Sequence, residues 1–187
     1  MFGTILISVC TLMHLYVFWR AASVPFVDRH VPRKILIGTG VILWAVFLAG
    51  RVIGHGGTGD LAGTLEFLGM NWMGILFLTF IPLFSIDVVT LFGFLMPRLS
   101  PSLRGWALLA GGMFSAIALF QGLRPPVVEK YEVILPRLPD SMDGTVLVAL
   151  SDMHLGSQFG KRWLEARIAQ VKAQQPDVVV LLGDIFE

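Results

Sequence analysis

The sequence predicts a multi-pass α-helical membrane domain of four helices, followed by the first βαβ part of an α/β domain. Four apolar runs are long enough to cross the hydrocarbon core of a bilayer, at residues 2–19, 35–53, 70–95 and 106–123. Residues 1–124 carry 12 charged side chains, whereas the shorter segment 125–187 carries 15. Two β-branched runs in that second segment enclose a helical stretch. We therefore expect a four-helix transmembrane domain at 1–124 and a water-soluble domain at 125–187.

The first and third apolar runs each allow a second interpretation. A signal peptide would need a charged start and an A-x-A-like cleavage site, and the first run has neither, so we expect a retained helix. The third run is longer than one crossing needs and contains Pro82. Tilt, a kink at the proline or an interfacial extension would each accommodate its length, and one bent helix is favoured over two re-entrant halves.

The basic residues predict the orientation in the membrane. Cytoplasmic loops are enriched in Lys and Arg. The loops after the first and third runs together hold six basic residues: Arg20, Arg29, Arg33, Lys34, Arg98 and Arg104. On the opposite side, only Arg51 and Arg124 lie close to the membrane. We therefore expect an integral protein of a bacterial cell membrane with the segment after Arg124 on the extracytoplasmic side, close to the bilayer surface.

Several polar and small residues inside the apolar runs have a structural or a functional interpretation. Asp87 lies in the third run, where a carboxyl group is costly and is a functional candidate by default; pairing with a neighbouring helix is the simpler explanation. His14 is expected to form a hydrogen bond across helices rather than to bind a ligand. Ala107, Gly111 and Ser115 form a small-residue face on the fourth run. That face predicts close packing against another helix of this chain or against a second copy.

Polar residues follow both strands of the predicted βαβ unit. The strands are expected at 145–151 and 178–182, with an amphipathic helix at 161–175 between them. Asp152 and His154 follow the first strand, and Asp184 follows the second. Because parallel strands end at the same edge of a sheet, these three side chains should meet there. Their oxygen and nitrogen donors suit a divalent metal such as Mn, Fe or Zn.

These motifs resemble a known family. SDMHLG at 151–156 and PDVVVLLGDIFE at 176–187 are similar to the opening half of the calcineurin-like metallophosphoesterases, which carry D-x-H and then G-D-x-x-[D/N/E]. Residues 131–139 resemble the first strand of the membrane-anchored bacterial branch. Glu187 stands where the family more often has Asp or Asn. The resemblance covers roughly the last third of the chain and implies a sandwich of two sheets flanked by helices.

The resemblance also implies a site and a reaction. Asp152 and His154 would bind one divalent metal ion, and Asp184 would bridge it to a second. The reaction would be hydrolysis of a phosphomonoester or phosphodiester, with a lipid headgroup or envelope polymer as a reasonable substrate class. The family's later G-N-H-[D/E] and G-H-x-H motifs are absent, so the general-acid histidine is expected beyond residue 187. We therefore expect the intact protein to be a hydrolase and this fragment alone to be inactive.

Composition limits the alternatives. A net charge of +1 gives no basic footprint for nucleic acid, and the single cysteine, Cys10, excludes an intrachain disulfide. The rival hypothesis is a non-enzymatic multi-pass membrane protein that keeps a vestigial phosphoesterase segment. Asp87 and the small-residue face are the features that would support it. A downstream continuation of the reading frame with the missing motifs would favour the enzyme.

Overall fold

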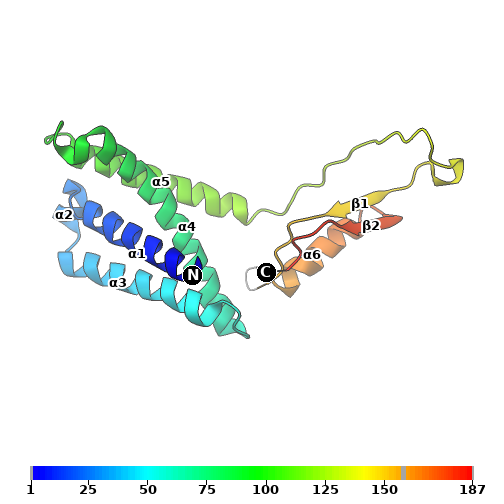
Figure 1. The fold of residues 1–187 in the computed structure, drawn as a ribbon, viewed down its shortest axis with the longest axis horizontal. Coiled ribbons are helices and arrows are strands. Elements are labelled where there is room, and N and C mark those ends of the chain that lie inside the picture. Colours follow the sequence, from blue (N-terminus) through cyan, green and yellow to red (C-terminus); the bar gives the residue numbers. More distant parts are fainter. Residues whose placement is uncertain (1, 157–158, 187) are drawn as a thin grey trace. The chain divides into compact units, whose positions relative to one another are not determined.

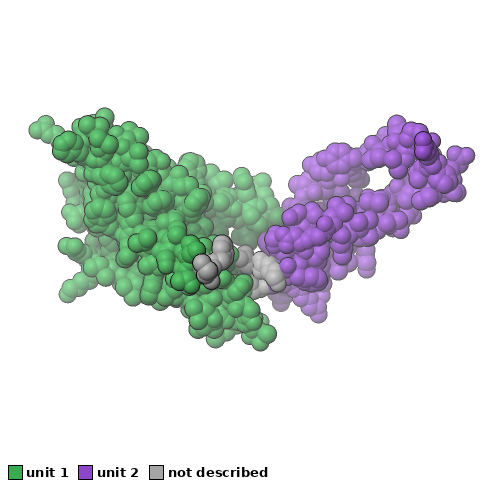
Figure 2. Space-filling view, viewed as in Figure 1, with its two compact units in different colours: residues 1–124 green, residues 125–187 purple. Residues whose placement is uncertain are grey.

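The chain forms two compact units, residues 1–124 and residues 125–187 (Figure 2). A computed structural model describes residues 2–156 and 159–186. The first unit is helical, and the second combines a short sheet with a helix (Figure 1). The change from one unit to the other coincides with Pro125 and Pro126, where proline cannot continue a helix.

Four long apolar helices lie where the hydropathy of the sequence predicts membrane spans, which confirms that part of the predicted fold. Each is long enough to cross a bilayer. They are α1 (Phe2–Ala21), α3 (Arg33–Ala49), α4 (Asp60–Val89) and α5 (Ser100–Gly122). A π-helical turn, η1 (Gly50–Gly54), prolongs α3. The structure also contains a short helix, α2 (Pro25–His30), which the sequence analysis did not predict.

Helix α4 is continuous from Asp60 to Val89 and carries Pro82 in its interior. The interpretation as one helix is therefore confirmed, although α4 begins and ends earlier than the apolar run 70–95. The chain leaves α4 through a tight turn containing the 3-10 segment η2 (Leu91–Gly93). Leu91 and Phe92 adopt left-handed backbone angles there, with φ of 47° and 57°. This turn stops the helix before the apolar run ends.

Helix α4 packs against α1, α3 and α5, so it is the central helix of the first unit. The buried apolar core joins Cys10 and Val17 of α1 to Leu76 and Leu83 of α4, with Phe47 and Ala107 from the other two helices. Most other apolar side chains point outward, as expected for a surface that faces lipid.

The small-residue face of α5 packs on α4. Ala107, Gly111 and Ser115 are all buried. A Cβ atom added at Gly111 would lie 2.7 Å from the Cα atom of Thr79 in α4, so only glycine permits this approach. The partner of the predicted face is therefore a helix of the same chain.

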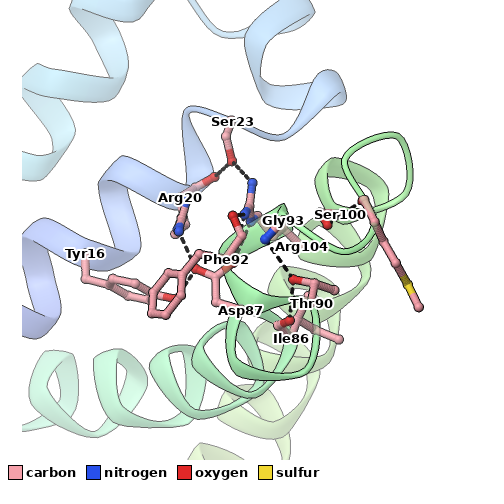
Figure 3. Close-up of polar contacts among 11 residues, drawn as sticks. Tyr16, Arg20, Ser23, Ile86, Asp87, Thr90, Phe92, Gly93, Ser100 and Arg104 are labelled. Carbon is pink, nitrogen blue, oxygen red and sulfur yellow. Dashed lines mark hydrogen bonds and ion pairs between the residues drawn. The ribbon is translucent and has the colours of Figure 1, made fainter.

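Asp87 is completely buried and is held by two arginines (Figure 3). Arg104 Nε and Nη2 each lie 2.9 Å from Asp87 Oδ1, while Arg20 and the Tyr16 hydroxyl contact Oδ2. The contact between Arg20 Nε and Asp87 Oδ2 is an ion pair, but Nε forms no hydrogen bond with the carboxylate. The placement of Arg20 and Arg104 in loops was wrong: they lie in α1 and α5, where both pair with the buried Asp87. The other basic residues placed in the first loop also lie in helices, Arg29 in α2 and Arg33 and Lys34 in α3.

His14 also bonds across helices. Its Nδ1 accepts a hydrogen bond from Trp72 Nε1 of α4 at 3.3 Å, and its ring stacks on Phe18. The expected structural role for this histidine is confirmed.

The second unit contains a two-stranded parallel sheet. Strands β1 (Leu147–Leu150) and β2 (Val178–Leu181) pair in register, with Leu147 opposite Val178 and Leu150 opposite Leu181. Helix α6 (Lys161–Lys172) connects them, and a 3-10 turn, η3 (Asp140–Met142), precedes β1. The predicted strand–helix–strand order is confirmed. In the described part of this unit, the surrounding sandwich of two sheets is not seen.

Residues 131–139 form no strand, so the first strand that was predicted there from the resemblance is not formed. The side chains of Tyr131 and Ile134 are more than 80% exposed. An isolated strand leaves its backbone groups without ladder partners, and the described sheet consists of β1 and β2. The apolar side chains of both strands are likewise mostly exposed.

Candidate metal centre

The site forms where β1 and β2 end. Beyond the strands the two chain segments remain joined by backbone hydrogen bonds: Asp152 N donates to Gly183 O at 3.2 Å, and His154 N donates to Asp184 O at 3.2 Å. Leu155 N then donates to Ile185 O at 2.7 Å. The loops therefore continue the parallel pairing, which brings residues far apart in the sequence to one edge.

Three side chains converge at this edge. One potential ligand atom from each of Asp152, His154 and Asp184 lies within 4.8 Å of the others. Within this group, His154 Nε2 lies 3.3 Å from Asp184 Oδ2. The structure thus brings together the three residues that the sequence singled out, while their role as metal ligands stays a prediction.

The backbone at the site is unusual. Asp152, His154 and Asp184 all have positive φ, at 53°, 43° and 49°. Aspartate and histidine enter this left-handed region more often than most residues, yet three such positions in one cluster carry conformational strain. Strain of this kind gathers at functional sites, because a ligand or a reaction requires the side chains in that direction. No residue pattern in the sequence predicts these backbone angles.

Gly183 has a separate role in the turn that presents Asp184. Its φ is 117°, a value that residues with a side chain avoid. Its carbonyl accepts the hydrogen bond from Asp152 N, so the glycine links both loops. The sequence indicates this turn, because Gly183 directly precedes Asp184.

The ligand atoms are accessible. Met153, between Asp152 and His154, is 6% exposed and anchors the loop inward, whereas the side chains of His154 and Asp184 are 45% and 54% exposed. Of the two carboxylates, that of Asp184 contacts His154, with Oδ2 at 3.3 Å from Nε2. Both carboxylates are open to solvent, so a cation can reach their oxygen atoms.

The geometry fits a divalent ion. Oxygen and nitrogen ligands bind zinc at about 2.0–2.2 Å, so two neighbouring ligands of one ion lie about 3.0–3.5 Å apart. The 3.3 Å between His154 Nε2 and Asp184 Oδ2 matches that spacing, and the ligand atoms of all three residues lie within 4.8 Å of one another. Two carboxylates and one imidazole are a donor set for Mn, Fe or Zn. Glu187, the fourth motif position, lies outside the described residues.

Comparisons with known proteins agree with this arrangement. A transmembrane protein with metallophosphoesterase domain from Danio rerio is 36% identical to the chain over 81 residues, and so is its counterpart from Bos taurus. Each match covers 43% of this chain and 18% of the relative. An uncharacterized metallophosphoesterase of Campylobacter jejuni is 34% identical over 65 residues, covering 35% of this chain and 17% of that protein.

These relatives support a membrane-anchored metallophosphoesterase family for the chain. The family expected from the D-x-H and G-D motifs is thereby confirmed. The chain spans less than a fifth of the length of these relatives. No protein-family model matches it, and no solved structure is significantly similar. Because the relatives come from vertebrates and from a bacterium, they do not assign the chain to a bacterial membrane.

Proposed function

We propose that this chain is the membrane anchor and the first metal-binding part of a metal-dependent phosphoesterase. The convergence of Asp152, His154 and Asp184 at the carboxyl edge of two parallel strands carries the proposal. The left-handed backbone at all three positions and the names of the relatives support it independently. The four apolar helices would keep the hydrolytic domain at the membrane.

The three side chains would have different roles. Asp152 and His154 would hold a first divalent ion, and Asp184 would bridge to a second, because its carboxylate offers two oxygen atoms. Divalent ions at such a site neutralise phosphate oxygens and activate water for in-line attack. The half-exposed position of His154 and Asp184 leaves room for a phosphate group to approach.

The remaining parts of the site would come from residues beyond 187. Three ligands do not complete two metal centres, and a general-acid histidine is still required. We propose that these groups, and the strands of a two-sheet sandwich, cover the apolar side chains that β1 and β2 expose. The 187-residue chain alone should bind metal weakly and hydrolyse phosphodiesters at background rate.

Substrate and location follow from the membrane anchor. A phosphomonoester or phosphodiester at the bilayer surface, in a lipid headgroup or an envelope polymer, is the proposed substrate class. The domain would lie on the extracytoplasmic side, because most basic residues gather at the opposite end of the helices.

The test is hydrolysis of a generic phosphodiester with Mn²⁺ by a protein that carries the whole reading frame. Asp184→Asn should lower the rate by about a hundredfold or more, because both ions lose a shared ligand. Asp152→Asn should lower it less, since the second ion keeps its other ligands. Glu165→Gln, on the exposed face of α6, is the matched control and should retain full activity. Full activity of Asp184→Asn would refute the proposed mechanism.

A further inference from the structure

An apolar groove runs along α5 beside the short helix α2. Its volume is about 780 Å³, within the range typical of small-molecule sites. Ser102 is the polar side chain of its lining; the walls are otherwise apolar or glycine, and include Phe26 of α2 and Trp106, Leu109 and Met113 of α5. The groove follows α5 from its first turn, at Ser102, toward the middle of the helix. It therefore enters the hydrophobic zone from one end of the bundle.

That end of the bundle is basic. The helix ends and connections at residues 20–34 and 87–104 lie there, and they contain six basic residues against two acidic ones. One acidic group, Asp87, is already engaged by both Arg20 and Arg104 in the buried cluster. That cluster keeps one positive charge in excess. Arg29 and Arg98 are exposed at the same end. Arg29 follows the groove residue Val27 by two positions, and Arg98 precedes the groove residue Ser102 by four. Positive charge at this end of the groove would attract an anionic headgroup, while the apolar walls suit a hydrocarbon chain.

The buried cluster also links α5 to the turn between α1 and α2, and Figure 3 shows Arg104 beside Ser23. Arg104 Nη1 lies 3.4 Å from Ser23 Oγ, and Ser23 immediately precedes the residues that line the groove. Val24 is 4% exposed because it packs under Gly105, where an added Cβ would lie 3.2 Å from Val24 Cγ1. The start of α5 and the α1–α2 turn are thereby fixed to each other. The groove is therefore present in the structure without a ligand.

We propose that this groove binds an acyl chain of an anionic phospholipid, whose headgroup lies among the basic residues at the mouth. Basic pockets between membrane helices recognise anionic headgroups, and a zwitterionic lipid would gain only the apolar contacts. The site belongs to the helical unit and does not depend on the phosphoesterase reaction.

Native mass spectrometry of the full 187-residue chain tests the proposal. The chain in detergent is mixed with equal amounts of phosphatidylglycerol and phosphatidylcholine. One bound phosphatidylglycerol should exceed bound phosphatidylcholine about fivefold, the factor expected from roughly one effective basic contact. Equal binding of the two lipids would overturn the proposal.

Two glycine variants locate the site. Gly112 lines the groove, and an added Cβ there meets no atom within 4 Å, so Gly112→Leu fills the groove without a clash. Gly74→Leu is the matched control, since Gly74 also faces open space but lies on α4 outside the groove. The preference should disappear in Gly112→Leu and persist in Gly74→Leu. Retention by Gly112→Leu, or a chain dimer that this variant alone dissociates, would contradict a lipid in the groove.

Discussion

His154 Nε2 lies 3.3 Å from Asp184 Oδ2, although the two residues follow different strands. The contact depends on backbone hydrogen bonds that continue the parallel pairing past the strand ends. His154 Nε2 and Asp184 Oδ2 can each bind a cation through a lone pair, so their spacing suits two ligands of one ion. The geometry of the metal centre thus arises from two short strands and their first turns, before any other part of the domain contributes.

Membrane orientation can be tested with single cysteines. His30→Cys and Leu99→Cys lie at the basic end of the helices, and Thr58→Cys lies at the other end; all three positions are exposed. An impermeant thiol reagent applied to intact cells should label only the Thr58 site, because basic loops stay cytoplasmic. The native Cys10 is buried and should not react with the reagent. Labelling at His30 and Leu99 but not at Thr58 would place the metal centre in the cytoplasm.

The Asp87 cluster should stabilise the helical unit. Asp87→Ala leaves Arg20 and Arg104 buried without a counter-charge, and loss of one partner from such a cluster costs about 3–5 kcal/mol. Thermal unfolding in detergent should show a lower midpoint for this variant. Asp60→Ala, at the exposed start of α4, is the control and should cost less than about 1 kcal/mol. Equal losses in the two variants would show that the cluster does not lock the bundle.

Helix contact at Gly111 should be similarly sensitive. In Gly111→Ala the new methyl group meets the backbone of Thr79, so α4 and α5 must separate, at a cost of about 1–3 kcal/mol. The neighbouring Gly112→Ala points into open space and should be neutral or slightly stabilising, since alanine favours helix. The same unfolding measurement compares them. A stable Gly111→Ala protein would argue against the close packing of these helices.

The sequence was sufficient for features that depend on local pattern. The four apolar helices follow from hydropathy, and the βαβ unit follows from two β-branched runs around an amphipathic stretch. The positions of Asp152, His154 and Asp184 at one edge follow from parallel pairing alone.

Features that depend on tertiary contacts were not predictable. Hydropathy reports the apolar length of a span, not the ends of the helix, so Arg104 was taken for a loop residue although it lies in the first turns of α5. The short helix α2 gives no periodic signal over only 6 residues. Residues 131–139 have strand-like composition, but a strand also requires a neighbour to pair with.

Direct metal binding tests the central claim, that Asp152, His154 and Asp184 form one metal site. The measurement is the electron paramagnetic resonance signal of free Mn²⁺ during titration with the 187-residue chain. The signal should fall as the chain binds Mn²⁺ weakly, and Asp184→Asn should abolish this binding while the exposed Glu165→Gln leaves it unchanged. Equal Mn²⁺ binding by Asp184→Asn and the unaltered chain would contradict the site.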